Sequence, residues 1–262
     1  MFEMRLNDDM TKDKGVDAFH SFIHLDAVDS TNSYIRRLLR QGVEFDGLTL
    51  VVADSQIAGR GQKGNSWESE DGKNLTFSIL CHPRFLKASE QYLMSQMIAL
   101  SVQETYSHYV DDVTIKWPND IYWKDKKISG TLIECDLIGK KINNCVVGTG
   151  MNVNQETFLS DAPNPISLRM ITGKDYDLKD LLDEVARRFV SYLEFAESGE
   201  ADAIRQRYKQ RLYRRSGYHL YNDANGNFMA ALVDVENSGR LLLVDTHNTV
   251  RRYEFKELKF VL

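Results

Sequence analysis

The chain has 262 residues, of which 42% are hydrophobic and 27% are charged, and these proportions are ordinary for a globular protein. Its formal net charge is −5, so the overall field does not favour nucleic acid, and no apolar run approaches the roughly 20 residues of a membrane span. A chain of this length can bury a sizeable core in one large domain, or in one large and one small domain.

The N-terminal residues are polar and mixed in charge, and they lack the apolar region of a signal peptide. We therefore predict a polar leader over residues 1–18. The three cysteines, Cys81, Cys135 and Cys145, form no Cys-x-x-Cys pair, and each occurs in an apolar run. This pattern favours small buried side chains in a reducing, cytoplasmic protein over a disulfide framework or a zinc site.

Hydrophobic periodicity predicts helices and strands over most of the chain. A stripe of apolar residues predicts a first helix at residues 32–41, capped by Ser30 or Thr31 and ended by Gly42. A much longer helix is expected at residues 89–109, where two adjacent apolar rows recur at helical spacing. Further helices are predicted at 178–196 and 201–212, and strands at 48–53, 75–81, 113–117, 128–137 and 141–152.

The pattern changes after Ser216-Gly217, where short strands replace the helices. Asn225-Gly226 is a strong hairpin signal within these strands, which are expected at 218–221, 228–235, 241–245 and 251–255. Roughly 45 residues are too few to be very stable alone, so we predict a small β-barrel docked on the main domain. The predicted boundaries are 1–18 for the leader, 19–214 for the main domain and 215–262 for the small domain.

The stretch from Gly59 to Trp67 places three glycines, two cations and an aromatic ring within nine residues. No Leu, Ile, Val, Met or Phe occurs from Ala58 to Asn74, so aliphatic packing does not explain this loop. Glycines let a backbone approach a ligand closely, and Arg60 adds a planar fork suited to phosphate or carboxylate. The loop indicates nucleotide handling, although it matches neither the P-loop nor the G-x-G-x-x-G pattern. The alternative is a polar surface hairpin.

Four further motifs accompany this loop in a fixed order along the chain. They are Asp29-Ser30-Thr31-Asn32, Lys116-Trp117-Pro118-Asn119-Asp120, Lys127-Ile128-Ser129-Gly130 and Gly148-Thr149-Gly150-Met151-Asn152. Together the five motifs resemble those of the biotin protein ligases, also called biotin–[acetyl-CoA-carboxylase] ligases, over about residues 30–154. The resemblance implies an α+β fold. Its catalytic domain would be like that of class II aminoacyl-tRNA synthetases, a mixed β-sheet with helices, followed by a small SH3-like C-terminal β-barrel.

The implied reaction has two steps and uses ATP and biotin as substrates. The biotin carboxylate attacks the α-phosphate of ATP, which releases pyrophosphate and leaves biotinyl-5′-AMP. A lysine amine of a biotin carboxyl carrier protein then attacks the acyl carbon, and AMP leaves. Such a protein needs cations and N–H donors around the phosphate and no nucleophile of its own. Mg²⁺ is implied by the ATP chemistry, and the acidic residues near the motifs do not identify its ligands.

The resemblance assigns residues to each part of this site. The biotin-binding residues would be Ser30, Thr31, Asn32, Gln56, Arg60, Gly61, Gln62, Lys127 and Gly130. The residues that bind ATP or the adenylate would be Gly59, Arg60, Trp67, Lys116, Asn119, Lys127, Gly148, Gly150 and Asn152. Arg60 and Lys127 would act in catalysis at the carboxylate–phosphate junction. Asp120 is the candidate to orient or deprotonate the incoming lysine, whose amine has a reference pKa of about 10.4.

Each of these residues also has a plain structural interpretation. Ser30 to Asn32 suit a helix cap, Lys127 suits a solvated hairpin turn, and the glycines from 148 to 150 suit a β-bulge. Gln62 departs from the commonest bacterial pattern, which has a second arginine at this place. We expect the glycine-rich loop to be mobile without ligand and to close over the intermediate, because it lacks apolar anchors.

Two other functions remain open from the sequence. One is a lipoate ligase or octanoyltransferase, although the usual R-R-x-S-G-G-G loop of those proteins is absent. The other is a biotin-binding module without turnover, which would need no cluster of phosphate-binding cations. We expect no DNA binding, because the residues before the catalytic pattern are too few for a domain. The protein would be a monomer or a homodimer, with the strand edge at 141–147 as a possible contact.

Overall fold

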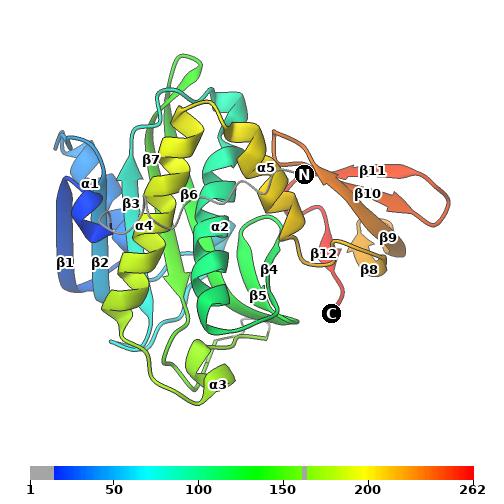
Figure 1. Ribbon diagram of the computed structural model, residues 1–262, viewed down its shortest axis with the longest axis horizontal. Coiled ribbons are helices and arrows are strands. Elements are labelled where there is room, and N and C mark those ends of the chain that lie inside the picture. The colour runs from blue at the N-terminus through cyan, green and yellow to red at the C-terminus, as the bar shows by residue number, and fades with distance from the viewer. Residues whose placement is uncertain (1–14, 161–163) are drawn as a thin grey trace.

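A computed structural model of the protein describes residues 15–160 and 164–262 (Figure 1). Most of the expected leader, residues 1–14, lies outside the described residues. The chain forms a seven-stranded sheet of order β1-β2-β3-β7-β6-β5-β4 and a five-stranded sheet of order β11-β10-β9-β8-β12. Only β1 and β2 pair in parallel within the first sheet, and its other neighbours are antiparallel. The fold is therefore mixed α+β.

The large sheet consists of β1 (Ser21–Val28), β2 (Thr49–Gln56), β3 (Leu75–Cys81), β4 (Val113–Lys116), β5 (Asp120–Trp123), β6 (Lys126–Ile138) and β7 (Lys141–Met151). The small sheet consists of β8 (Tyr218–Asp223), β9 (Gly226–Val235), β10 (Leu241–Asp245), β11 (Val250–Tyr253) and β12 (Lys259–Phe260). The α-helices are α1 (Thr31–Arg40), α2 (Tyr92–Tyr109), α3 (Leu168–Thr172), α4 (Leu178–Glu197) and α5 (Ala201–Gln210). Short 3-10 turns lie at Val16–Ala18, Gln62–Gly64 and Ala88–Glu90.

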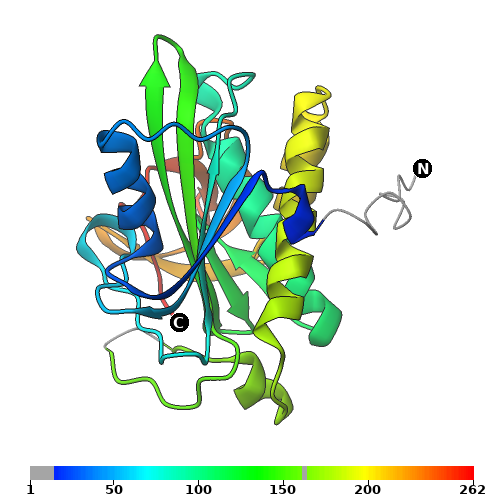
Figure 2. The same cartoon turned by 90° about the vertical axis from the view of Figure 1, so that its left-hand side faces the viewer.

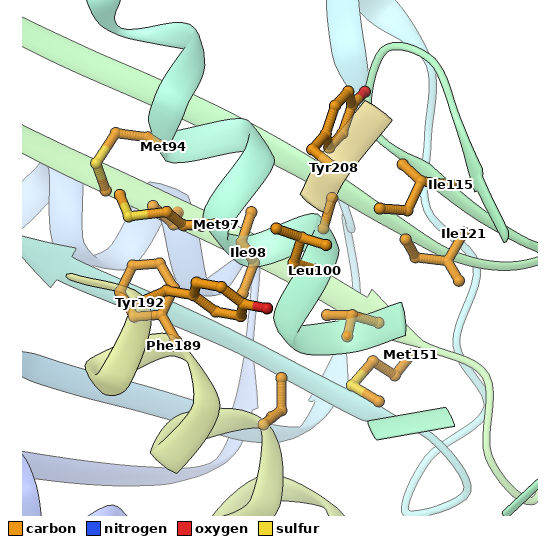
Figure 3. Packing of buried hydrophobic residues seen from close by; sticks show 14 of the residues in the cluster. Met94, Met97, Ile98, Leu100, Ile115, Ile121, Met151, Phe189, Tyr192 and Tyr208 are labelled. Carbon is orange, nitrogen blue, oxygen red and sulfur yellow. The ribbon is translucent and has the colours of Figure 1, made fainter. Parts of the chain in front are cut away.

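Helices cover both faces of the large sheet. Figure 2 shows α1 on one face and α2 with α4 on the other. The α1 face has a small core, in which Ile35 packs with Val51, Leu80 and Val146. The opposite face holds the main core, and Figure 3 shows α2 methionines packed against Phe189 of α4. The site described below uses the end of α1, so it is built on the thinner of the two layers.

Helix α2 is buried on nearly all sides. Leu93, Met97 and Leu100 lie in the core as expected, but Ser101 and Thr105 on other sides of the helix are buried as well. Their hydroxyls donate to backbone carbonyls one turn back, which satisfies them without water. A helix sandwiched between a sheet and two other helices needs no polar face.

The expected elements are present with small shifts at their ends, and four elements were not anticipated. These are β1, β5, β12 and α3. The expected open edge is absent at Cys145 to Val147, which pair with both β6 and β3, and the dimer contact itself stays a prediction. Among the described residues, β1 has an open outer edge, and β6 pairs only with β7 beyond Gly130.

The small sheet contacts the large one through a few specific interactions. Trp117, at the end of β4, is 3% exposed and donates from Nε1 to the carbonyl of Gly239 at 2.8 Å. The Arg214 guanidinium donates to the carbonyls of Leu220 and Val261, so it fixes the chain where it enters and leaves this sheet. Across residues 15–160 and 164–262, no helix has the length and apolarity needed to cross a membrane.

Candidate active site

A cavity of about 940 Å³ lies where the large sheet, the glycine-rich loop (residues 59–67) and the small sheet meet. Pockets for small molecules typically measure about 300–1,000 Å³. Every residue that the sequence assigned to the site lines this cavity except Gly59. They are Ser30, Thr31, Asn32, Gln56, Arg60, Gly61, Gln62, Trp67, Lys116, Asn119, Asp120, Lys127, Gly130, Gly148, Gly150 and Asn152. Gly59 instead pairs with Trp67, whose N–H donates to its carbonyl at 2.8 Å.

One end of the cavity is a network of buried polar side chains around Asn32. The Asn32 amide nitrogen donates to the carbonyl of Leu132 at 3.2 Å and to Glu134 Oε2 at 3.0 Å. Its oxygen accepts from the Ser78 hydroxyl at 2.6 Å. A carboxylate only accepts hydrogen bonds, so the amide can lie only with its nitrogen toward Glu134. Asn32 is 2% exposed and is held from both sides.

Thr31 and Gln56 extend this network toward β2. The Thr31 N–H donates to Gln56 Oε1 at 2.8 Å, and the Thr31 hydroxyl lies 3.2 Å from the same oxygen and 2.7 Å from Ser78 Oγ. Of the two expected caps, Ser30 occupies the N-cap position of α1, but its side chain makes no hydrogen bond to the helix. The Gln56 side chain from the neighbouring strand satisfies the orphan N–H instead. This leaves the Ser30 side chain to line the cavity.

Arg60 reaches the same network from the glycine-rich loop. Its guanidinium contacts both oxygens of Glu134, with Nη2 3.1 Å from Oε1 and Nη1 3.3 Å from Oε2. Glu134 therefore joins Arg60 to Asn32. None of the five motifs includes Glu134, although its place on β6 carries a signal. Side chains alternate along a strand, so Glu134 shares a face with Gly130 and Leu132.

Lys127 also lines the cavity. Its ammonium is 2.7 Å from Asp120 Oδ1 and 5.7 Å from the centre of the Trp67 ring. Gly130 makes room for it, since a Cβ at this position would lie 3.1 Å from Lys127 Nζ. The Lys127 side chain is 25% exposed and that of Asp120 is 19% exposed, which is far from the solvated turn that the sequence also allowed. Arg60 and Lys127 thus each have a carboxylate partner, Glu134 and Asp120.

The glycines of β7 make room for two side chains of the site. A Cβ on Gly148 would lie 2.1 Å from Asn32 Oδ1, and a Cβ on Gly150 would lie 2.2 Å from Trp67 Cε2. These distances are far inside van der Waals contact, so only glycine fits beneath Asn32 and Trp67. The indole nitrogen of Trp67 is buried without a hydrogen-bond partner among the described residues. Close approach of these glycines to an adenylate stays a prediction.

Lys116 lies against two aromatic rings at the other end of the cavity. Its ammonium is 4.8 Å from the ring centre of Tyr122 and 5.0 Å from that of Phe260. Burial lowers the pKa of Lys116, although the nearby charge of Asp120 works in the opposite direction. The cation is therefore held by ring faces, which attract positive charge.

The small sheet also contributes to the cavity wall. Leu258, Lys259 and Phe260 line it beside the expected residues from β4. Nothing in the local sequence of this C-terminal segment indicates a site. Its position depends on how the small sheet docks, which a sequence pattern does not specify.

The donor set of the cavity does not suit a metal held by protein ligands alone. Among the described residues, no group of three or more His, Cys, Asp and Glu side chains could hold a metal ion. The two carboxylates that line the cavity are already engaged. Asp120 pairs with Lys127, and Glu68 accepts N–H groups from Leu159 and Ser160.

Comparisons with known proteins agree with this arrangement. Residues 25–152 match the model of the biotin/lipoate A/B protein ligase family. The biotin–[acetyl-CoA-carboxylase] ligase of Paracoccus denitrificans is 24% identical over 82% of this chain and 90% of its own. The bifunctional ligase/repressor BirA of Bacillus spizizenii is 30% identical over 62% of this chain.

Solved structures of biotin protein ligases are also similar to this chain. The biotin protein ligase of Aquifex aeolicus in complex with biotin and ATP has a TM-score of 0.76 and 28% identity, covering 93% of this chain and 100% of that chain. The chain spans about half the length of the Bacillus spizizenii relative, 50% by residues. The match therefore does not establish the full activity of that relative for this chain.

Proposed function

We propose that the protein is an ATP-dependent biotin protein ligase, which forms biotinyl-5′-AMP and transfers biotin to a lysine of a carrier protein. The observation that carries this proposal is one cavity that contains Arg60, Lys127 and a buried polar network around Asn32. Biotin has a ureido ring at one end and a carboxylate at the other. The polar network can satisfy the N–H and carbonyl groups of the ring, and the two cations can receive the carboxylate and the phosphate.

The two cations have a clear task in the first step. The biotin carboxylate and the α-phosphate are both anions, so they repel each other as they approach. Arg60 and Lys127 would offset this repulsion and stabilise the negative charge that develops as pyrophosphate leaves. Glu134 and Asp120 hold these side chains in place before any ligand binds. Such pre-organisation lowers the cost of reaching the reactive geometry.

The second step needs a neutral amine from the carrier lysine. Its nitrogen attacks the acyl carbon of the mixed anhydride, the bond to the phosphate oxygen breaks, and AMP leaves. We propose that Asp120 orients this amine or takes its proton. Its carboxylate is already 2.7 Å from Lys127 Nζ, so this role requires Asp120 to be shared between the two nitrogens.

In this proposal, Mg²⁺ would enter the site bound to the phosphates of ATP. Magnesium prefers oxygen ligands and usually keeps several waters while it bridges substrate phosphates. The engaged carboxylates of the cavity fit that arrangement better than a protein-held metal, so we route no step through a metal site.

The finer structural and cellular expectations remain part of the proposal. They are the likeness of the main domain to class II aminoacyl-tRNA synthetases, the SH3-like character of the five-stranded sheet, and the domain boundaries. A biotin carboxyl carrier protein as partner, the lack of DNA binding, the monomeric or homodimeric state and a cytoplasmic location are also predictions.

Exchange of labelled pyrophosphate into ATP tests the proposed function directly. We expect exchange in the presence of Mg²⁺ and biotin, and none with lipoate or octanoate. Exchange with either of those acids instead would indicate a lipoate ligase. A folded protein that exchanges with no acid would contradict the ligase proposal and favour a binding module or an acyltransferase that does not use ATP.

A variant of Lys127 tests the assignment of the site. We expect Lys127→Ala to lower the biotin-dependent exchange rate by about 100-fold or more, the size of effect seen when a charge-stabilising donor is lost. Lys126→Ala is the matched control, because Lys126 is the neighbouring lysine and is exposed. An unchanged rate in Lys127→Ala, with both variants folded by circular dichroism, would refute the role of Lys127.

A further inference from the structure

Two loops that are far apart in the sequence meet at the mouth of the cavity. One is the glycine-rich loop with the residues that follow it, and the other comprises residues 155–160. Gln155 is 1% exposed, and its Oε1 accepts from the N–H of Glu70 at 3.0 Å and from the Asn74 amide. Its nitrogen donates to Glu68 Oε1 at 3.2 Å. Gln155 therefore anchors the start of the second loop to the first.

The carboxylate of Glu68 holds the far end of the same loop. Its Oε1 accepts from the N–H of Leu159 and its Oε2 accepts from the N–H of Ser160, each at 2.8 Å. Apolar packing cannot replace these bonds, because Leu159 is 86% exposed. Hydrogen bonds to an ionised acceptor are about twice as strong as neutral ones. One carboxylate thus provides the main attachment of residues 159 and 160 that the structure records.

The charge state of Glu68 agrees with this geometry. Burial alone would raise the pKa of the carboxyl group. Hydrogen bonds from Ser160, Leu159 and Gln155 outweigh that effect, and the pKa of Glu68 is lowered. The group is therefore ionised at neutral pH, as its three N–H donors require.

The attachment connects two walls of the proposed site. Trp67 directly precedes Glu68, and its indole covers Gly150 and Gly130 on the cavity floor. Phe158 directly precedes Leu159, and both Phe158 and Ser160 line the cavity. A displacement of the second loop would therefore open the cavity beside Trp67.

We propose that Glu68 is a positioning residue that ties residues 159 and 160 to the glycine-rich loop and so keeps the activated acyl-adenylate enclosed. This inference rests on the proposed function, because it concerns the intermediate of that reaction. A mixed anhydride is hydrolysed by water, and a closed wall excludes water from it. Loss of the Glu68 carboxylate leaves the N–H groups of Leu159 and Ser160 without their acceptor, and the wall opens more often.

Amide hydrogen exchange tests the attachment without reference to any activity. We expect Glu68→Ala to accelerate exchange at the amides of Leu159 and Ser160 by at least tenfold. Glu68→Gln retains an oxygen acceptor but loses the charge, so its effect should be intermediate. Glu70→Ala is the matched control, since Glu70 is exposed and contributes its backbone N–H. Amides of β3 should exchange alike in all four proteins, which excludes global unfolding.

The functional part is tested by the release of AMP in the absence of carrier protein. With biotin and ATP present, we expect Glu68→Ala to form AMP about tenfold faster than the wild type or Glu70→Ala, because the intermediate is lost to water. Unchanged amide exchange would overturn the proposal outright. Faster amide exchange with unchanged AMP release would also overturn it, since the attachment would then not protect the intermediate.

The two tests separate this inference from the proposed function. If the wild type shows no biotin-dependent exchange of pyrophosphate into ATP, the ligase proposal fails. The amide comparison then still decides whether Glu68 positions the second loop.

Discussion

At the scale of single residues, the site is built from pairs in which a side chain fills the space that a glycine leaves. Asn32 lies over Gly148, and Trp67 lies over Gly150. The two glycines are neighbours on the same face of β7, since side-chain directions alternate along a strand. Asn32 and Trp67 therefore lie next to each other but are supported by different glycines.

This arrangement predicts that alanine at position 148 and alanine at position 150 weaken the binding of different substrates. In Gly148→Ala the new methyl group displaces Asn32, so the KM for biotin should rise by about tenfold or more while the KM for ATP changes little. In Gly150→Ala the methyl group displaces Trp67, and the KM for ATP should rise instead. The magnitude corresponds to the loss of one or two hydrogen bonds or of one stacking contact.

Steady-state kinetics of pyrophosphate exchange, with each substrate varied in turn, measures both constants. Each variant is the control of the other, because both place a methyl group on β7. Equal effects of the two substitutions on both substrates would contradict the separate roles of Asn32 and Trp67. Circular dichroism establishes that both proteins are folded.

Much of the residue set was predictable, but the contacts between its members were not. The motifs identify Arg60 and Lys127 because glycine and cations occur together in the sequence. Glu134 was missed because its significance depends on Arg60, which lies on a different element. The sequence likewise suggested Ser30 or Thr31 as a helix cap, whereas Gln56 from β2 accepts the N–H of Thr31 in the first turn of α1. Interactions between distant elements decide both cases.

At the scale of elements, the main core is formed by α2 against the sheet, with α4 covering it (Figure 3). Phe189 of α4 is fully buried in this core. The core supports the strands that carry Lys127 and the β7 glycines, but Phe189 itself does not line the cavity. A substitution of Phe189 should therefore lower the stability of the protein without changing the chemistry of the site.

We expect Phe189→Ala to lower the free energy of unfolding by about 3–5 kcal/mol, the usual cost of a large cavity in a core. The melting temperature should fall by on the order of 10 °C, and the exchange rate per folded molecule should stay close to the wild-type value. Thermal unfolding followed by circular dichroism measures the first effect. A loss of pyrophosphate-exchange activity at a temperature where the variant is folded would contradict the prediction that Phe189 affects stability alone.

The elements found from the sequence are those with a clean pattern, and the missed ones lack it. The strand β3 alternates visibly and is fully buried, and it was predicted with correct ends. The strand β1 alternates only from Ile23 to Asp26, because the apolar Phe22 lies exposed on the same face as His24 and Asp26, so its pattern is short. The strand β5 has four residues and follows Pro118 closely, and such a short run resembles a turn. Pairing with β4 and β6 makes it a strand.

At the scale of the whole molecule, the cavity depends on the docking of two sheets. Phe260 of β12 lies against Lys116 of β4, and Lys259 and Leu258 extend the same wall. The hydrogen bond from Trp117 to Gly239 lies at this junction. The sequence predicted the small β-rich segment but contained no signal for its share of the cavity.

We expect Trp117→Phe to weaken the docking of the small sheet. The ring packing is largely kept, but the carbonyl of Gly239 loses its buried donor, at a cost of about 1–3 kcal/mol. Trypsin should then cut faster after Arg215, an exposed residue in the segment that connects the sheets. Limited proteolysis followed by mass spectrometry measures the rate.

Trp123→Phe is the matched control for this experiment, because Trp123 lies on the neighbouring strand β5 and its ring contacts the Lys124 ammonium at 4.7 Å. Its cleavage rate should match that of the wild type. Equal cleavage rates for Trp117→Phe and the wild type would show that the small sheet is held by other contacts.

The glycines under Asn32 and Trp67 also restrict the order in which this site can change over evolutionary time. A substitution of Gly150 is blocked while the indole lies above it, whereas a smaller residue at position 67 would free that position at once. The same dependence links position 148 to Asn32. In each pair, the large side chain must therefore be replaced by a smaller one before its glycine can be substituted.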